Sequence, residues 1–274
     1  MSKRTIFVGD VHGCLEELDE LLRIIRCQSG DRLIFLGDLI DRGPDPVGCV
    51  RRVRELQCES VLGNHEEKAL RWLRYEAARA VSGTPNPMKA PWPDRQKEWE
   101  SLSRDDVDWL SSLPILIEVN PKLVAVHAGL EPAFPLDRQR MNKVIRVRYV
   151  DSKGKMVSLG EDSVIQPAGT TYWSKSWKGP QSVIYGHAVH SLNLPVMDTP
   201  GGRWPFGLEP SLEMAKEIYQ EPVCVGIDTG CVFGGYLSAV YVEDSSPIPT
   251  TLARVKAKRQ YRSLPPGLEV PHFV

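Results

Sequence analysis

Six side chains that can bind metal ions follow short apolar runs in this sequence. They are Asp10, His12, Asp38, Asn64, His127 and His187. Residues two apart in extended backbone point to the same side, so Asp10 and His12 can reach one ion. Any one of the six is more typical of a turn, a helix cap or a core histidine, but their recurrence after five apolar runs indicates a metal centre.

The donor set contains oxygen and nitrogen but no sulfur, which suits Mn, Fe or Zn in a reactive site rather than Ca or a structural zinc. Two such ions about 3.5–4 Å apart, bridged by a carboxylate, drive in-line attack on phosphorus. Other catalytic patterns are absent. His65-Glu66 opens like a zinc-protease helix, but Ala69 stands where the second histidine is needed. No P-loop, dinucleotide glycine motif or nucleophile elbow occurs.

Apolar runs that alternate with amphipathic segments predict the framework for these residues. Strands are expected at 5–9, 32–37 and 60–63, with helices at 15–25, 46–56 and 66–80 between and after them. The later pattern predicts strands at 115–119, 123–127, 183–185, 224–227 and 237–242. The fold class is therefore α/β, with two facing mixed sheets flanked by helices and the metal site at the carboxyl ends of strands.

The chain is expected to form a single domain over residues 1–274. Prolines and glycines bar regular structure at 82–94, and Ser103 with Asp106 resembles a helix start, so 81–113 is predicted to be an insertion or lid, or else an ordinary surface excursion. Residues 193–222 look like a loop with a short helix at 211–219. The tail from residue 246 is Pro-rich and basic, and is interpreted as solvated or, less simply, as a polyanion contact.

Composition excludes several classes of protein. The formal net charge of −1 gives no global basic field, so no dedicated nucleic-acid site is expected. No run approaches the roughly 18 apolar residues of a membrane span, and the one at 6–8 is too short for a signal peptide. The six cysteines include no C-x-x-C pair and are interpreted as reduced thiols, which are often buried. A cytoplasmic protein without membrane partners is expected.

Five strings carry a resemblance to a known family. They are GDVHG at 9–13, GDLIDRG at 37–43, GNHE at 63–66, HAG at 127–129 and YGH at 185–187. Together they resemble the calcineurin-like metallophosphoesterases, in particular their phosphoprotein phosphatase branch. RVRY at 146–149, followed by Gly154, and IDTGCVFGG at 227–235 resemble the symmetrical diadenosine tetraphosphatases and ApaH-like phosphatases. Bacteriophage-type Ser/Thr phosphatases share the first strings and an Asp-Thr-Gly.

The resemblance implies two divalent metal ions, with Mn favoured and Fe, Zn, Co or Ni as alternatives. Asp10 and His12 would bind the first ion, and Asp38 would bridge both. The second ion would take the remaining ligands, Asn64, His127 and His187. The phosphorylated substrate is then the expected partner.

The resemblance also implies catalytic roles. Arg42 would hold phosphate oxygens through a bidentate fork. Arg148 is the candidate for a second phosphate clamp, with Arg146 as its rival. His65 would be the general acid, kept protonated by Asp41, because a carboxylate next to an imidazole raises its pKa. The Asp-Thr-Gly string would be structural, or Asp228 would orient a ligand. Packing is the simpler role for the aromatic residues Trp92, Trp99, Tyr172, Trp173 and Trp177, and base stacking the alternative.

The expected function is symmetrical cleavage of dinucleoside polyphosphates of the Ap4A type by a metal-bridging hydroxide. A Ser/Thr protein phosphatase, a polyphosphatase and an RNA-cap-processing enzyme share the same chemistry and stay open as alternatives. A metal-binding scaffold without activity is disfavoured, because Asp41, Arg42 and His65 accompany the ligands.

Overall fold

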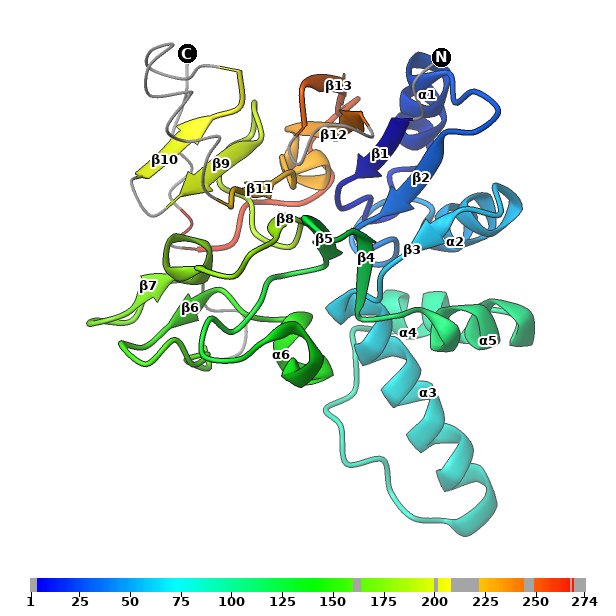
Figure 1. Ribbon diagram of the computed structural model, residues 1–274. Helices are drawn as coiled ribbons and strands as arrows, with labels where there is room; N and C mark the ends of the chain where they lie inside the picture. The colour runs from blue at the N-terminus through cyan, green and yellow to red at the C-terminus, as the bar shows by residue number, and fades with distance from the viewer. Residues whose placement is uncertain are drawn as a thin grey trace.

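Two β-sheets face each other at the centre of the computed structural model, which describes residues 4–159, 164–199, 202–207, 222–243, 249–266 and 268 (Figure 1). The five-stranded sheet has the order β13-β12-β1-β2-β3, and the six-stranded sheet has the order β10-β9-β11-β8-β5-β4. Helices flank both sheets. The predicted α/β class with two mixed sheets is confirmed.

The five-stranded sheet combines strands from both ends of the chain. Its members are β1 (Arg4–Val8), β2 (Arg32–Phe35), β3 (Glu59–Ser60), β12 (Tyr236–Glu243) and β13 (Thr251–Lys256). Strands β1, β2 and β3 pair in parallel, whereas β12 is antiparallel to β1 and to β13. Parallel pairing aligns the carboxyl ends of β1 and β2 at one edge, where a site can form.

The six-stranded sheet supplies the opposite wall. Its members are β4 (Leu116–Asn120), β5 (Leu123–Val126), β8 (Ser182–Tyr185), β9 (Val196–Thr199), β10 (Gly202–Pro205) and β11 (Cys224–Gly226). Strands β5, β8 and β11 are parallel neighbours, and β4–β5 is the hairpin predicted around residues 120–122. A separate pair joins β6 (Tyr149–Val150) to β7 (Thr171–Tyr172).

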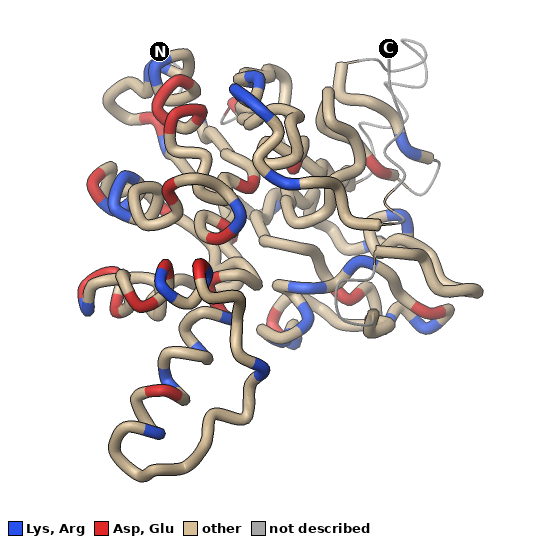
Figure 2. Tube along the Cα trace, turned by 180° about the vertical axis from the view of Figure 1, so that it is seen from behind, with Lys and Arg blue, Asp and Glu red and all other residues tan. Residues whose placement is uncertain are grey.

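Six α-helices are found in the described residues: α1 (Leu15–Ile25), α2 (Pro46–Glu55), α3 (Asn64–Ser82), α4 (Pro93–Glu100), α5 (Arg104–Ser112) and α6 (Met141–Val144). Short 3₁₀ turns are η1 (Leu136–Arg138), η2 (Trp173–Ser176) and η3 (Cys231–Phe233). Helix α3 projects from the body, and the chain returns beside it to α4 (Figure 1). Acidic and basic residues are interspersed along the trace (Figure 2).

Side-chain alternation in β1 explains why this strand reads as a continuous apolar run. Ile6 and Val8 pack with α1 and α2 on the outer face of the five-stranded sheet, whereas Phe7 packs between the two sheets. A strand buried on both faces needs apolar residues at every position. Each such side chain contributes about 1.5–3 kcal/mol when fully buried.

Several element boundaries differ from the sequence predictions. Strand β3 has only two residues, and α3 begins at Asn64, two residues early. Helix α4 was missed because Pro93 was interpreted as a helix breaker, although proline is favoured in the first helical turn. The β9–β10 hairpin lies where a loop was predicted, and the predicted helix at 211–219 falls outside the described residues.

The interpretation of the basic tail holds for most of its charges. Lys256, Lys258, Arg259 and Arg262 are exposed, as expected. Residues 251–256 form β13, however, and Arg254 lies 4.4 Å from the ring centroid of Tyr236, so this basic residue is a sheet contact. Arg51 and Arg54 on α2 both pair with the buried Asp106 of α5. The predicted capping box of Ser103 with Asp106 is confirmed. Among the described residues, no helix is long and apolar enough to cross a membrane.

Candidate metal centre

The fold brings all six predicted ligands to one region. Asp10 and His12 follow β1, and Asp38 follows β2 at the adjacent strand end. His127 and His187 follow β5 and β8 in the facing sheet. The sixth residue, Asn64, starts α3 and does not end a strand as predicted. Both walls of the sandwich therefore contribute to the cluster.

Asp38 lies at the centre of this cluster. Its Oδ1 is 3.3 Å from His127 Nε2, and its Oδ2 is 3.5 Å from His12 Nε2. Two groups of donor atoms, each within 4.8 Å, share this carboxylate: His12, Asp38 and His65, and Asp38, His127 and His187. The two oxygens of Asp38 thus face two different histidine groups, which is the arrangement that a bridging ligand needs.

The remaining two candidate ligands, Asp10 and Asn64, lie next to different histidines. Asp10 Oδ2 is 3.9 Å from His12 Nε2, and Asp10 Oδ1 accepts a hydrogen bond of 2.9 Å from the backbone N–H of His187. Asn64 Oδ1 is 2.9 Å from His127 Nε2. Asp10 is therefore next to the His12 group, and Asn64 is next to the His127 group.

Two histidines are oriented by backbone carbonyls in a way that fits metal binding. His12 Nδ1 lies 3.0 Å from the carbonyl oxygen of Ile40, and His127 Nδ1 lies 2.7 Å from that of Leu36. Since a carbonyl only accepts, each Nδ1 carries the proton and each Nε2 is left with a lone pair in the neutral ring. Both Nε2 atoms face Asp38. The residues present thus fit divalent ions.

Burial and charge shift the protonation of these ligands in the ion-free chain. Burial, followed by the nearby Arg42, lowers the pKa of His12 well below its usual range. Burial and Arg148 do the same for the pKa of His187. Burial opposes protonation of His127 as well, but the Asp38 carboxylate raises its pKa to about 9. The pKa of His127 is therefore shifted in the opposite direction to those of His12 and His187.

The backbone around the centre is strained at the same residues. Seven non-glycine residues of the described segments have a positive φ, and five of them are predicted site residues: His12, Asp38, Asp41, Arg42 and His187. Positive φ is uncommon for side-chain-bearing residues and costs of order 1–3 kcal/mol at each site. The rigid sheets hold these turns in place.

Glu66 fixes the loop that carries Asp38. Its carboxylate accepts backbone hydrogen bonds from Asp38, Leu39, Ile40 and Gly63, at 2.7–3.2 Å. The side chain is fully buried, and this burial raises its pKa to about 7. Gly63 must lack a side chain, because a Cβ there would collide with both Asp38 and Glu66. The sequence string GNHE contained Glu66, but its clamping role was not predicted.

Asp41 and His65 are in contact, as predicted, through the carboxylate and Nδ1. The same carboxylate accepts from the indole Nε1 of Trp99 at 2.8 Å and from Arg95. Glu98 accepts from the backbone N–H of Asp41 at 3.0 Å. Three residues of α4 therefore hold Asp41, and sequence reasoning missed all three roles, because no local spacing links α4 to residue 41.

The expected protonation of His65 is wrong for the ion-free chain. Burial lowers the pKa of His65 to about 3, and the nearby Arg42 adds to this effect while Asp38 opposes it. The Asp41 carboxylate that contacts Nδ1 is also bound by Arg95 and Trp99. With Nδ1 held by Asp41, His65 Nε2 faces the cluster, 3.8 Å from Asp38 Oδ2.

The three arginines predicted to matter have distinct environments. Arg42 Nη1 is 2.8 Å from His12 Nε2, so its guanidinium is aimed into the centre. Arg148 Nη2 donates to the carbonyl of His187 at 3.3 Å. Arg146, its rival, is instead engaged by the Glu67 carboxylate. The geometry therefore favours Arg148 over Arg146 as the arginine free to meet substrate.

Tyr172 is the centre of a group of aromatic and basic side chains. Tyr172 contacts Tyr149, His190 and the guanidinium of Arg203, and its hydroxyl has no hydrogen-bond partner. Arg203 is in turn paired with Asp198. Among the other aromatic residues, Trp99, Trp173 and Trp177 are buried in packing, while Trp92 is exposed. Asp228 bonds the N–H of Gly230 within its own loop, at 2.9 Å.

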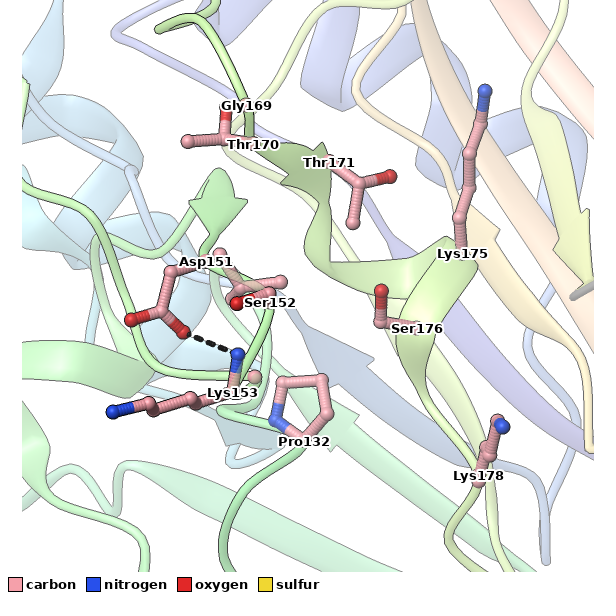
Figure 3. Close-up of a pocket in the computed structure, with 12 residues that line it drawn as sticks. Pro132, Asp151, Ser152, Lys153, Gly169, Thr170, Thr171, Lys175, Ser176 and Lys178 are labelled. Carbon is pink, nitrogen blue, oxygen red and sulfur yellow. Dashed lines mark hydrogen bonds between the residues drawn. The ribbon is translucent and has the colours of Figure 1, made fainter.

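A pocket of about 620 Å³ opens over the β6–β7 pair (Figure 3). Lys153, Lys175 and Lys178 line it together with the hydroxyls of Ser152 and Thr170. Asp151 also lines the pocket, so three ammonium groups face one carboxylate and the net positive charge suits an anion.

Comparison with known proteins decides the family. A sequence model of the calcineurin-like phosphoesterases matches residues 3–226, which include every residue placed in the centre above. The chain belongs to the calcineurin-like phosphoesterase family. It is therefore a hydrolase of the metallophosphoesterase class, and members of this class use divalent metal ions.

Named relatives of this metallophosphoesterase differ in their stated specificity. The symmetrical bis(5'-nucleosyl)-tetraphosphatase of Nitrosospira multiformis is 27% identical, over 93% of this chain and 98% of its own. The symmetrical enzyme of Vibrio campbellii is 28% identical, over 88% of this chain and 96% of its own. An asymmetrical bis(5'-nucleosyl)-tetraphosphatase of Oceanobacillus iheyensis is 27% identical, over 85% of this chain and 86% of its own.

Solved structures support the fold. A crystal structure described as a candidate diadenosine tetraphosphatase superposes with a TM-score of 0.66 at 27% identity, covering 94% of this chain and 95% of that one. A metallophosphoesterase from Sphaerobacter thermophilus superposes with a TM-score of 0.57 at 17% identity, over 93% of this chain and 90% of that one.

Proposed function

We propose that this metallophosphoesterase hydrolyses dinucleoside polyphosphates, and that it cleaves the tetraphosphate chain symmetrically. The observation that carries the proposal is the near full-length match to relatives named as symmetrical bis(5'-nucleosyl)-tetraphosphatases, which span up to 93% of this chain. The position of Arg148 beside His187 agrees with it, since a long polyphosphate needs cationic contacts beyond the reacting phosphorus.

The ligand set would divide between two divalent ions, Mn²⁺ being the favoured metal. Asp10 and His12 would hold the first ion, Asn64, His127 and His187 would hold the second, and Asp38 would serve both. Bound there, the ions would supply activation of the attacking water and neutralisation of phosphoryl charge.

The side chains around the ligands bind and orient the substrate. Arg42 reaches the centre at His12 and forms a fork with phosphoryl oxygens. Arg148 neutralises the next phosphate along the chain. To act as the acid, His65 would carry a second proton at Nε2, besides the one that Nδ1 donates to Asp41, and would pass it to the departing phosphate oxygen. The indole of Trp99 keeps Asp41 in place for that task.

We propose in addition that the lysine-lined pocket serves as a distal contact for the substrate. Lys153, Lys175 and Lys178 line it, and a dinucleoside polyphosphate carries negative charges that such side chains would bind. Lys175→Ala should raise KM for Ap4A and leave p-nitrophenyl phosphate hydrolysis unchanged. Lys122→Ala, in the β4–β5 turn at the opposite end of β5 from His127, is the matched control.

Product analysis with Mn²⁺ present tests the proposal directly. Symmetrical hydrolysis of Ap4A yields only ADP. Formation of ATP and AMP would show asymmetrical cleavage, as the relative from Oceanobacillus iheyensis is named for.

Ranking of Ap4A, a phosphoserine peptide, polyphosphate and capped RNA by kcat/KM completes the test. A peptide preference would replace the proposal with a protein phosphatase.

A further inference from the structure

A second cluster of metal-binding side chains lies outside the catalytic centre. Cys14 at the start of α1, Glu17 in its first turn and Cys231 in η3 each offer one donor atom, and these atoms lie within 4.8 Å of one another. Their side chains are buried, with exposed fractions of 0%, 0% and 2%. Segments more than 200 residues apart in the chain therefore meet at two thiols and a carboxylate.

The carboxylate of Glu17 is incompletely satisfied. Its Oε1 accepts from the backbone N–H of Lys258 at 2.8 Å and from the hydroxyl of Tyr261 at 2.7 Å. Its Oε2 is buried and has no hydrogen-bond partner. Both donors are neutral groups, and among the described residues no basic side chain is paired with this carboxylate. A buried charge without a counter-charge is strongly unfavourable.

Neither sulfur of the cluster is consumed in a disulfide, so both Cys14 and Cys231 are available as ligands. All six cysteines are free thiols. Burial also keeps this pair from oxidants, since reactive thiols are accessible and have a lowered pKa.

We propose that Cys14, Glu17 and Cys231 form a separate structural site for a thiophilic divalent ion, with Zn²⁺ the expected occupant. Zinc binds thiolates at about 2.3 Å and carboxylates at about 2.0–2.2 Å, so tetrahedral ligands lie about 3.5–3.8 Å apart. The three donor atoms lie within 4.8 Å of one another, and rotation of the side chains would bring them to the shorter separations of zinc ligands. The Tyr261 hydroxyl adds an oxygen at the same cluster.

The proposed ion would brace the catalytic loop without taking part in the reaction. Cys14 follows His12 by two residues, and Cys231 follows the Asp228 loop. The carboxylate of Glu17 already holds the chain at Lys258 and Tyr261, so the ion would tie α1, η3 and the end of the chain together. Its donor set contains sulfur, unlike that of the catalytic centre, so the two sites select different metals.

Cobalt substitution separates this site from the catalytic one. Wild-type protein reconstituted with Co²⁺ should show a thiolate-to-cobalt charge-transfer band, which oxygen and nitrogen ligands cannot give. The band should persist in His127→Ala, which damages only the catalytic centre. It should persist also in Cys224→Ser, a control cysteine that is equally buried at 1% exposure. It should disappear in Cys231→Ser and weaken in Glu17→Gln.

Elemental analysis supplies the second readout. Zinc-grown wild-type protein and Cys224→Ser should hold one equivalent of metal per chain more than Cys231→Ser. Absence of the charge-transfer band in the wild type would overturn the proposal without reliance on any variant. Persistence of the band in folded Cys231→Ser would overturn it too. A disulfide between Cys14 and Cys231, detected by mass spectrometry as a mass lower by two hydrogens, would overturn the proposal as well. Neither readout depends on the substrate of the enzyme.

Discussion

The indole Nε1 of Trp99 donates a hydrogen bond of 2.8 Å to the carboxylate of Asp41, across 58 residues of sequence. Trp99 is buried, with 1% of its surface exposed, and its ring packs against Trp72 of α3. The segment 81–113 is thus joined to the site through α4. Its movement as a lid stays a prediction.

Replacement of Trp99 by Phe should keep most of the packing but remove the donor to Asp41. We expect a loss of about 1–2 kcal/mol in the free energy of unfolding, because the carboxylate loses a buried partner. We expect kcat to fall by roughly 3–10-fold with little change in KM, since Asp41 acts through His65. Urea titration and steady-state kinetics measure both. Trp109→Phe on α5 is the control, and equal loss of kcat there would contradict the assignment.

The Glu66→Gln substitution tests the backbone clamp. A glutamine amide nitrogen cannot accept from the N–H groups that now bond both carboxylate oxygens. The free energy of unfolding should fall by about 2–3 kcal/mol, and metal should bind more weakly because Asp38 is displaced. Calorimetric Mn²⁺ titration and thermal melting give the two values. Glu76→Gln, farther along α3, should change neither.

Replacement of the two arginines before β6, Arg146 and Arg148, should have different effects on kcat/KM. Arg148→Ala should lower kcat/KM for Ap4A by roughly tenfold or more, because a charge-assisted contact to phosphate is lost. Arg146→Ala removes only the pair with Glu67 and should stay within roughly threefold of the wild type, as a partly exposed ion pair contributes little. The reverse order would reassign the phosphate clamp to Arg146.

Glu98 should make stability depend on pH. Burial raises its pKa to about 7, against the opposing charges of Arg95 and Arg262. A raised pKa means that the folded chain binds the proton more tightly than the unfolded chain. The stabilisation is therefore complete below about pH 4.5 and is lost as the pH rises through 7. Solvent screening limits it to about 1–2 kcal/mol. In Glu98→Gln the urea midpoint should depend less on pH between pH 5 and 8 than in the wild type. An unchanged pH dependence would show that Glu98 is not its source.

Removal of the ions should destabilise the fold through Asp38. Excess Mn²⁺ at 100 times its Kd should add about 2.7 kcal/mol per independent site to the stability of the wild type. Asp38→Asn loses the shared charge, so its melting temperature should respond weakly to Mn²⁺. Elemental analysis of the same samples should give a lower metal content. Full occupancy in Asp38→Asn would contradict the bridging position.

The sequence could indicate that the six candidate ligands gather because five of them follow strands. Each ligand follows a local apolar run, and parallel pairing of β1 with β2 needs no further information to bring Asp10 and Asp38 together. The contacts of α4 could not be predicted in this way. Trp99 and Arg95 meet Asp41 only through tertiary packing, and no spacing in the sequence records such a contact.

The other errors have three separate causes. Pro93 begins a helix instead of breaking one, and the hairpin β9–β10 is too short to show clear alternation. The pKa of His65 was predicted in the wrong direction because burial outweighs its carboxylate neighbours. Burial is a property of the whole fold, so a pair of adjacent residue types does not reveal it.

The positive φ angles at His12, Asp38 and His187 have an evolutionary consequence. At these positions selection acts on the side chain and on the backbone together. A replacement must supply the same donor atom and also tolerate a left-handed turn, and few amino acids do both. Drift should therefore be slow at these turns even where a chemically similar ligand exists. Specificity can diverge more freely around Arg148, which is not among the residues with a positive φ, so its backbone accepts many side chains.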